Sequence, residues 1–215
     1  MRSRSFLPLL LLVPAISAPA QVSVSIGLPH MNIGINVPTV PDLVQVPGSP
    51  AYYAPEMDTN FFFYDGMYWV FKDDNWYASS WYNGPWASVH PEAVPLFILR
   101  IPVAYYRQPP AYFRGWQADG PPRWEDHWGA DWAQRRAGWD QWDHRAVPPL
   151  APLPAYQKNF QGKQYPTPDR QHAIHTQNYG YKPKEPVVRG NYAAQAQHSR
   201  STPKEGHPEE APKQR

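Results

Sequence analysis

The sequence predicts an α+β fold: a small antiparallel β-meander covered by a Trp-rich helix, or by two short helices, and followed by a disordered C-terminal tail. Three stretches of the 215-residue chain lead to this prediction. Residues 61–86 are a dense run of aromatic residues that short turn signals interrupt. Residues 123–145 place tryptophans at helical spacing. Residues 146–215 are rich in Pro, Gln and Lys without sustained periodicity, so we expect too little apolar burial there to offset the entropy of ordering the chain.

Residues 1–20 have the pattern of a secretory signal peptide. Two arginines precede an apolar stretch at 6–16, which is shorter than the roughly 20 residues that a membrane-spanning helix needs. Ala18-Pro19-Ala20 gives a small-x-small cleavage pattern, so the mature chain is predicted to begin at Gln21, with an uncleaved anchor as the alternative. We therefore expect an exported protein without a transmembrane span in the mature chain, located in the periplasm or outer envelope of a Gram-negative bacterium.

The absence of cysteine narrows the possible functions. It excludes a disulfide framework, thiol catalysis and a Cys-ligated metal. In an exported chain with ten tryptophans, it indicates a protein that is stabilised by packing.

Residues 21–55 are expected to form an extended N-terminal segment with short strands. Aliphatic residues alternate with small or polar ones at 22–26 and again at 33–37, with the period of two that is typical of strands. Proline and glycine keep these runs short. Because Pro is tolerated at sheet edges, we expect the segment to lie along the meander and to supply an edge strand.

The meander begins with a hairpin at Asp65-Gly66. This dipeptide favours a two-residue type I′ turn, whose central residues both need positive φ, and the turn pairs Tyr64 with Met67. Since side chains alternate between the faces of a strand, one face carries Phe62, Tyr64, Met67, Trp69 and Phe71, and the other carries Phe61, Phe63, Tyr68 and Val70. Neither face is polar, so the hairpin exposes aromatics to a partner or needs a cover on both sides. We expect residues 21–55 and the Trp stripe of 124–142 to be these covers.

Further turns follow the hairpin. Asp73-Asp74-Asn75 leads into a third strand at about 76–79. The pattern leaves open whether this loop has two or three residues, and a shift of one residue exchanges the faces of the strand. Asn83-Gly84 marks the next turn, where Pro85 ends simple ladder pairing. The apolar run at 96–101 is predicted to be a compact strand.

Residues 123–145 complete the central unit, which we place at 56–145. Trp124, Trp128 and Trp132 are spaced by four and would form one stripe of a helix. Gly129 is unfavourable in a helix interior, so a break into two short helices is the alternative. A Trp stripe at helical spacing is usually a packing face, and we expect it to dock onto the meander.

Charge is distributed unevenly along the chain. Removal of residues 1–20 takes two of the 20 Lys+Arg and none of the 18 Asp+Glu, so the mature chain has no net charge. Residues 21–100 hold two bases and seven acids, whereas 146–215 hold ten bases and five acids. A basic tail on an acidic core predicts that the tail folds back or contacts an anionic surface, and a solvated polar tail is the alternative. Nucleic acid is disfavoured because the aromatic core is acidic and phosphate binding needs clustered Lys and Arg.

Four aromatic residues near the Asn83-Gly84 turn are the candidate contacts for a ligand or partner. They are Trp76, Trp81, Tyr82 and Trp86. Exposed rings of this kind stack on glycans or on protein partners, whereas core packing is the other interpretation.

Other side chains give weaker indications of chemistry. His172 and His175 are a close pair, but structural zinc sites use four ligands, so we predict no metal. Asp73 and Asp74 are candidates for the carboxylate pair of a hydrolase, although turn chemistry explains both. The sequence has no Gly-x-Ser-x-Gly, His-Glu-x-x-His, Walker or dinucleotide motif, which predicts no catalytic residue, no cofactor and no enzyme.

Long strings of the sequence resemble a group of exported proteobacterial proteins that are usually labelled hypothetical. The strings are VPGSPAYYAP, FFFYDGMYWVFKDDNWYASSWYNGPW, PEAVPLFILRIPVAYYRQPPAYFRGW and PPRWEDHWGADWAQRRAGWDQWDHR. APLPAYQKNFQGKQYP and YGYKPKEPVV, later in the chain, are similar too. The resemblance covers nearly all of the mature chain. It implies export and this modular layout, and it implies no activity.

Together these observations favour a non-enzymatic exported envelope protein of structural or binding type. Its basic tail is expected to contact an anionic component such as peptidoglycan, lipopolysaccharide or another envelope protein. One alternative is a glycan- or protein-binding module that uses exposed aromatics near residue 84. The other is an envelope hydrolase that uses the turn carboxylates.

Overall fold

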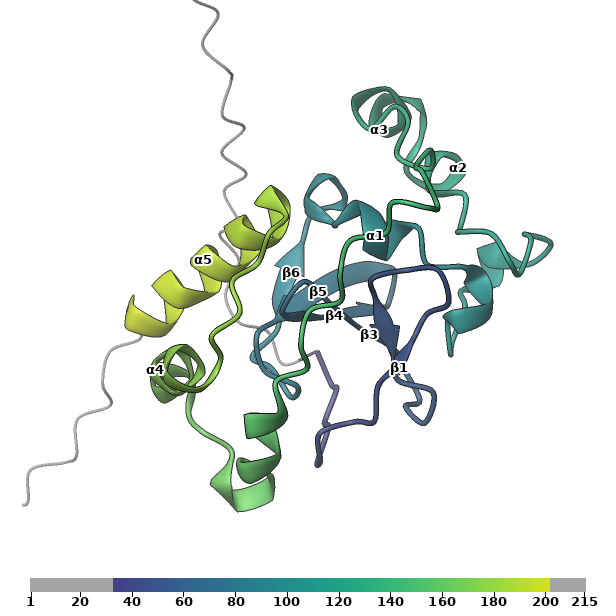
Figure 1. The fold of residues 1–215 in the computed structure, drawn as a ribbon. Coiled ribbons are helices and arrows are strands. Elements are labelled where there is room, and N and C mark those ends of the chain that lie inside the picture. The colour runs from purple at the N-terminus through teal and green to yellow at the C-terminus, as the bar shows by residue number, and fades with distance from the viewer. Residues whose placement is uncertain (1–32, 202–215) are drawn as a thin grey trace, which may run out of the picture.

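The structure, a computed structural model, describes residues 33–201 (Figure 1). The predicted signal peptide at 1–20 and the alternating run at 22–26 lie outside the described residues, as do residues 202–215. Within the described range the fold is α+β, as predicted, with an antiparallel sheet and short helices packed around it (Figure 1).

Six strands follow one another across the sheet in chain order, each antiparallel to the next. They are β1 (Val44–Gln45), β2 (Tyr52–Tyr53), β3 (Asn60–Tyr64), β4 (Met67–Lys72), β5 (Asn75–Ser79) and β6 (Ala87–Val89). The short strands β1 and β2 form one edge. The prediction that residues 21–55 supply an edge strand is therefore confirmed. The short strand expected from the alternating residues at 33–37 is wrong, because that segment forms no strand and packs against the second core instead.

The hairpin between β3 and β4 has the predicted turn and register. Asp65 and Gly66 have φ of 48° and 86°, and Tyr64 pairs with Met67. Positive φ at both central residues is what a type I′ turn requires.

The hairpin between β4 and β5 settles the loop length that the sequence left open. Asp73 and Asp74 have φ of 48° and 61°, and Lys72 pairs with Asn75. The loop therefore has two residues.

Both faces of the sheet are buried, as the lack of a polar face predicted. We call the two layers of packed side chains the first core and the second core. From the sheet, the first core takes Phe62, Tyr64, Met67, Trp69, Phe71 and Trp76. The second core takes Phe61, Phe63, Tyr68, Val70 and Tyr77. Trp124, Trp132 and Trp139 pack into the first core, and residues of 33–54 pack into the second, so both predicted covers are confirmed.

The Trp-rich segment forms two helices, α2 (Trp124–Trp128) and α3 (Ala130–Arg135). They are separated at Gly129, whose φ of 85° is a conformation that glycine adopts at no steric cost. The two-helix alternative is therefore confirmed. The helical structure ends before Trp139, which reaches the first core from a non-helical stretch.

The apolar run at 96–101 contains a helical turn, so the predicted strand is wrong. Helix α1 spans Leu96–Leu99, and the Pro95 carbonyl accepts hydrogen bonds from the backbone N–H groups of Ile98 and Leu99. Pro95 and Pro102 bracket the run and lack the N–H that ladder pairing uses. A short apolar run fits a buried helix as well as a strand. Short 3₁₀ helices lie on either side of α1: η1 (Pro91–Ala93), η2 (Val103–Tyr105) and η3 (Ala111–Phe113).

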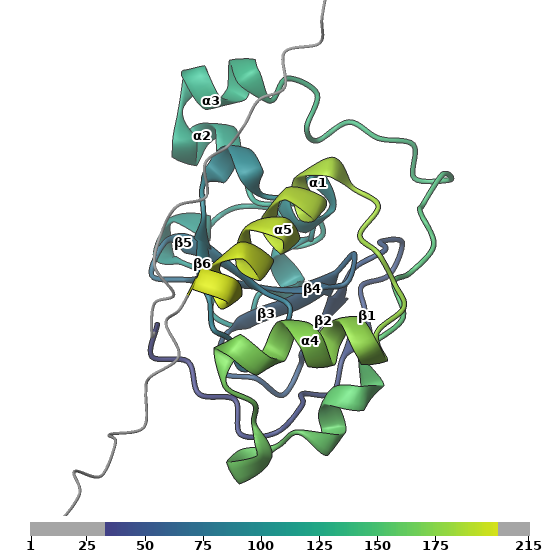
Figure 2. The same ribbon diagram turned by 90° about the vertical axis from the view of Figure 1, so that its left-hand side faces the viewer.

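Residues 146–201, which we call the C-terminal layer, are folded. The prediction of a mostly disordered tail from residue 146 is wrong for this part of the chain. The layer contains η4 (Ala155–Asn159), η5 (Gly162–Gln164), α4 (Pro168–Asn178) and α5 (Pro186–Ser201). Helices α4 and α5 pack against each other and lie together on the side of the molecule that faces the viewer in Figure 2.

A buried glutamine attaches the C-terminal layer to the sheet. Gln157 is 0% exposed and uses its full hydrogen-bonding capacity. Its Oε1 accepts from Tyr82 N at 3.2 Å and Tyr68 Oη at 3.3 Å. Its Nε2 donates to Ser80 O at 2.9 Å and Tyr156 Oη at 3.0 Å. Polar groups at such depth are almost always paired in native proteins.

Three other buried amides bond backbone groups in the same way. They are Gln195 with Ser80 N (2.9 Å) and Ala78 O (2.6 Å), Gln171 with Gly84 O (3.1 Å), and Asn191 with Ala93 O (3.2 Å). These partners lie in residues 78–84, at the end of β5 and beyond it, and in η1. The amide-rich composition that predicted disorder therefore supplies the groups that fix the layer in place.

Candidate functional site

The four aromatic residues predicted as ligand contacts are core residues. Trp76, Trp81, Tyr82 and Trp86 are at most 2% exposed. Trp81 alone contacts the rings of Tyr156, Phe160 and Tyr165, with centroids 5.6, 5.7 and 5.7 Å away. The expectation of exposed aromatics near residue 84 is therefore wrong. The C-terminal layer covers Trp81 and Tyr82, whereas Trp76 packs in the first core and Trp86 in the second.

The turn that these rings surround is also occupied by other parts of the chain. Tyr165 Oη and Gln171 Nε2 both donate to Gly84 O, and Asn83 Oδ1 accepts from Val37 N at 2.7 Å. The turn that the sequence favoured as a ligand-binding surface is thus a contact between different parts of the same chain.

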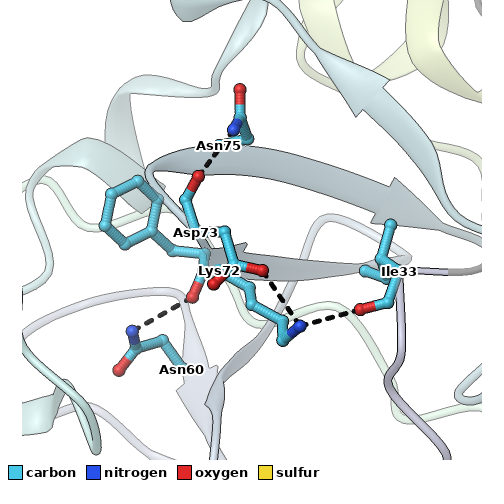
Figure 3. Close-up of polar contacts among 6 residues, drawn as sticks. Ile33, Asn60, Lys72, Asp73 and Asn75 are labelled. Carbon is cyan, nitrogen blue, oxygen red and sulfur yellow. Dashed lines mark hydrogen bonds and ion pairs between the residues drawn. The ribbon is translucent and has the colours of Figure 1, made fainter.

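The carboxylates considered for a hydrolase lie on the second hairpin and have separate partners. Figure 3 shows Lys72 Nζ between Asp73 Oδ2 at 3.0 Å and Ile33 O at 2.9 Å, and Asn75 Nδ2 bonded to the Asp73 carbonyl. The Asp73 side chain is 79% exposed. Asp73 therefore has two structural roles: it occupies the turn and forms an exposed ion pair with Lys72.

Asp74 joins the hairpin to α2. Its Oδ1 lies 2.9 Å from His127 Nε2 and accepts a hydrogen bond from Tyr112 Oη. The His127 and Tyr112 rings stack with centroids 4.2 Å apart. The two acids therefore face different partners, and turn and packing interactions account for both.

The two histidines of α4 differ in their surroundings. His175 is buried, and its Nδ1 lies 2.6 Å from Tyr156 Oη. Burial lowers the pKa of His175 to about 4, which keeps the ring neutral at pH 7. Within residues 33–201, no group of three or more His, Cys, Asp and Glu side chains is placed to hold a metal ion.

A cleft of about 390 Å³ lies where the C-terminal layer meets the first hairpin. This volume is within the range of roughly 300–1,000 Å³ that is typical of small-molecule sites. Five parts of the chain form it: Pro50 before β2, the β3–β4 hairpin, residues 96–100, residues 148–151 and residues 181–185. Its walls are mainly proline and aromatic side chains, namely Pro50, Tyr64, Phe97, Pro148, Pro149 and Tyr181.

Asp65 lines this cleft but is fully engaged. It accepts hydrogen bonds from Tyr181 Oη at 2.6 Å, from Lys184 N at 2.9 Å and from Glu185 N at 2.8 Å. These backbone N–H groups directly precede α5, which begins at Pro186. A turn residue of the sheet therefore acts as an N-terminal cap for a helix more than a hundred residues away in sequence.

Glu185 is the carboxylate of the cleft that lacks a matched partner. Its Oε1 accepts one long hydrogen bond, from Leu96 N at 3.4 Å. Its Oε2 is buried and accepts no hydrogen bond of normal geometry from the described residues. Burial raises the pKa of Glu185, and the nearby Tyr64 hydroxyl and the Leu96 N–H offset part of this increase. A buried carboxyl with a raised pKa in a cleft is typical of a functional position.

Two bases line the cleft without forming an ion pair to Glu185. Arg100 donates to backbone carbonyls in residues 139–141 and lies over the Phe97 ring at 5.4 Å. Lys184 is exposed, with Nζ 5.9 Å from the centre of the Tyr181 ring. No base of the described residues therefore forms an ion pair with Glu185, although Arg136 and Arg100 attract its charge from a longer distance.

Charge also distinguishes the C-terminal layer from the rest of the described chain. The layer holds seven Lys+Arg and two Asp+Glu, whereas residues 33–145 hold eight Lys+Arg and thirteen Asp+Glu. Residues 202–215 hold three of each. The excess of positive charge thus belongs to folded structure. The exposed bases are Lys158, Lys163, Arg170, Lys182, Lys184 and Arg189.

The cleft is not predictable from local sequence patterns, because half of its lining residues come from the segment that was predicted to be disordered. One signal for it was available in YGYKPKEP, the string at 179–186, where Glu185 and Pro186 follow a Tyr-rich stretch. Glu followed by Pro indicates a helix start. That signal points to α5 but not to its contact with Asp65.

Comparisons of the chain with models of known protein families, with curated protein sequences and with solved structures found no match. In residues 33–201, no helix combines the length and the apolar character that a membrane span requires.

Proposed function

We propose that the protein is a non-enzymatic envelope protein of the binding type, exported by its N-terminal signal, which contacts an anionic envelope component through the C-terminal layer. The observation that carries this proposal is the charge separation between two folded regions. The layer has a net charge of +5, and residues 33–145 have a net charge of −5.

Several of the positively charged side chains lie on the helices of the C-terminal layer or on the connection between them. Arg170 is on α4, Arg189 is on α5, and Lys182 and Lys184 lie on the connection between these helices. Clustered Lys and Arg attract surfaces rich in phosphate or carboxylate. The opposite charge of the remaining described chain favours an orientation in which the layer faces such a surface. The attraction is screened beyond about 8–10 Å at physiological ionic strength.

Two surfaces of the proposed compartment carry the required chemistry. Lipopolysaccharide presents phosphates, and peptidoglycan presents carboxylates. An acidic envelope protein is the third partner with the same charge. The signal-peptide pattern at 1–20 and the resemblance to exported proteins support this location.

Binding of the chain from Gln21 to Arg215 to lipopolysaccharide, to peptidoglycan and to anionic phospholipid vesicles tests the proposal. We expect saturable binding to at least one of them, weakening as salt is raised. Lys158→Gln, Lys163→Gln and Arg170→Gln together remove three exposed charges of the layer. Because each base near an anionic surface contributes up to about 1 kcal/mol, the affinity should fall about tenfold or more.

A matched control removes the same charge from the other region. Arg107, Arg114 and Arg145 are exposed residues of 33–145, and their replacement by Gln should leave binding nearly unchanged. Equal losses in the two triple variants, or binding that salt does not affect, would contradict the proposal.

A further inference from the structure

The cleft between the first hairpin and α1 combines apolar walls with a carboxylate that forms no ion pair with the described residues. Its Tyr64 and Phe97 rings and its prolines offer a surface for an apolar group. Glu185 lines the same space. Small-ligand sites usually consist of an apolar cavity on which a small number of polar groups converge.

The two carboxylates of the cleft, Asp65 and Glu185, differ in how many hydrogen bonds they accept from the chain, and this difference indicates a structural role for Asp65 and a ligand-binding role for Glu185. Asp65 has three hydrogen-bond donors within 2.9 Å and thereby fixes the start of α5. Glu185 has one hydrogen bond of normal geometry, from Leu96 N at 3.4 Å, a weaker interaction with the Tyr64 hydroxyl, and a buried Oε2 without a hydrogen bond of normal geometry. Burial of an unpaired carboxylate is costly unless a cation or additional donors compensate. The Tyr64 hydroxyl, Leu96 N and the more distant Arg136 supply only part of this compensation, because burial still raises the pKa of Glu185.

We propose that this cleft binds a small organic cation, a primary amine carried on an aromatic or other apolar body. Its ammonium group pairs with Glu185 and supplies the missing donors. Its apolar body lies against Tyr64, Phe97 and the prolines of 148–149. This site uses an acidic group inside a cleft, and of the six exposed bases in the proposed envelope contact only Lys184 lines it.

The two basic side chains that line the cleft do not form an ion pair with Glu185. Arg100 directs donors to carbonyl oxygens of 139–141, and Lys184 is exposed near the Tyr181 ring. Neither lies within ion-pair distance of Glu185. Both disfavour a second positive charge on the ligand, so one amine group per ligand is expected.

Three probes of similar size and different charge test the proposal. They are 2-phenylethylamine, 2-phenylethanol and 3-phenylpropionate. Each is titrated at pH 7 into the chain from Gln21 to Arg215, and NMR shifts of Phe97 and Tyr181 are followed. Because hydrogen bonds to a charged group are about twice as strong as neutral ones, we expect the amine to bind about tenfold more tightly than the alcohol. The acid should bind most weakly.

The variant Glu185→Gln keeps the shape of the side chain and an acceptor for Leu96 N. It should reduce the affinity for the amine to that for the alcohol and leave the affinity for the alcohol unchanged. Glu125→Gln is the matched control, because Glu125 Oε2 is also buried without a partner but lies outside this cleft. Phe97→Leu, a second variant at the wall, should weaken all three probes and preserve their order.

Several results would overturn the proposal. Equal affinities for the three probes would mean an apolar cavity without charge selection. Tightest binding of the acid would assign the site to Arg100 and Lys184. Shifts confined to residues outside the cleft, or an amine preference that survives Glu185→Gln, would exclude Glu185. None of these results affects salt-dependent binding to envelope surfaces, since Glu185→Gln leaves every exposed base of the layer in place.

Discussion

Residues 33–145 and the C-terminal layer are held in the fold by different interactions. In the first core, the rings of Phe71, Trp76 and Trp124 lie with centroids 5.0 to 6.1 Å apart. In the layer, Gln157 and Gln195 instead bond backbone atoms of 78–82. Apolar burial dominates the first region, whereas the layer combines apolar contacts with buried amide hydrogen bonds to the backbone of the sheet.

This difference makes the two regions depend on each other. Aromatic burial contributes about 25 cal/mol per Å² removed from water, and it needs covers on both faces of the sheet. A hydrogen bond adds only about 1 kcal/mol net, but a buried backbone group that loses its partner costs about 1–3 kcal/mol. The sheet therefore needs the amides of the layer, and the layer needs the backbone of residues 78–84.

Removal of the layer should have the largest effect. In a chain that ends at Arg145, Trp81 and Tyr82 lose their cover, and Ser80 N and Ser80 O lose their amide partners. We expect no cooperative thermal unfolding by circular dichroism and exposed Trp by fluorescence quenching. A truncated chain with the thermal transition of the full chain would show that the sheet stands alone.

Replacement of one buried amide should have the next largest effect. Gln157→Ala removes four hydrogen bonds and leaves buried partners on Ser80 and Tyr82. The free energy of unfolding, measured with urea, should decrease by about 3–5 kcal/mol. Gln164→Ala, the same change at an exposed position of the layer, should stay within about 0.5 kcal/mol. Similar small effects at both positions would mean that buried amides do not hold the layer.

Acid should destabilise the layer through His175. Gln157 Nε2 donates to Tyr156 Oη, which leaves the Tyr156 proton for His175 Nδ1, so a neutral ring fits this network. The pKa of His175 is lowered to about 4 in the folded chain by burial, with the charge of His172 as a smaller cause. Its ordinary value in the unfolded chain is about 6.5.

Between these pKa values the unfolded chain binds a proton that the folded chain does not. The free energy of unfolding should therefore decrease as the pH falls from about 6.5 to about 4, by up to about 3 kcal/mol. Urea unfolding at pH 7 and pH 4.5 measures this difference. His175→Gln should reduce it, whereas His144→Gln, at an exposed position, should not. An equal pH dependence in all three chains would exclude His175 as its source.

The smallest expected effect compares two aspartates at the same turn position. Asp65 and Asp73 both have φ of 48°, and Asn is tolerated at such positions. Asp65→Asn weakens the cap on α5 and should cost about 1–2 kcal/mol, whereas Asp73→Asn should cost less than about 0.5 kcal/mol. Thermal unfolding of the two single variants tests this. A larger loss for Asp73→Asn would argue against the capping role of Asp65.

Local signals of the sequence predicted the sheet well. Asp65-Gly66 fixed both the turn and the register, because a type I′ turn allows few other residues. The alternation of aromatics then assigned Phe62 and Phe61 to opposite faces, and Gly129 marked the break between α2 and α3. Each of these features depends on residues that are close together in sequence.

Long-range contacts decided the parts that were not predicted. Gln157 is 75 residues from Tyr82 along the chain, so its amide carries no local signal of burial. For the same reason the sequence predicted that Trp81 would be exposed to a ligand. It also gave no signal for the cleft around Glu185. The strand predicted at residues 96–101 was wrong for a different reason, because a short apolar run does not distinguish a buried helix from a strand.

Amide hydrogen exchange of the chain from Gln21 to Arg215 tests the central claim most directly. The claim is that the C-terminal layer folds with the sheet through buried amides. It predicts that backbone amides of α4 and α5 near Gln171 and Asn191 are protected, and that Gln157→Ala lowers protection in both the layer and β5. Exchange of residues 168–197 at the rate of an unfolded chain, beside a protected sheet, would contradict it.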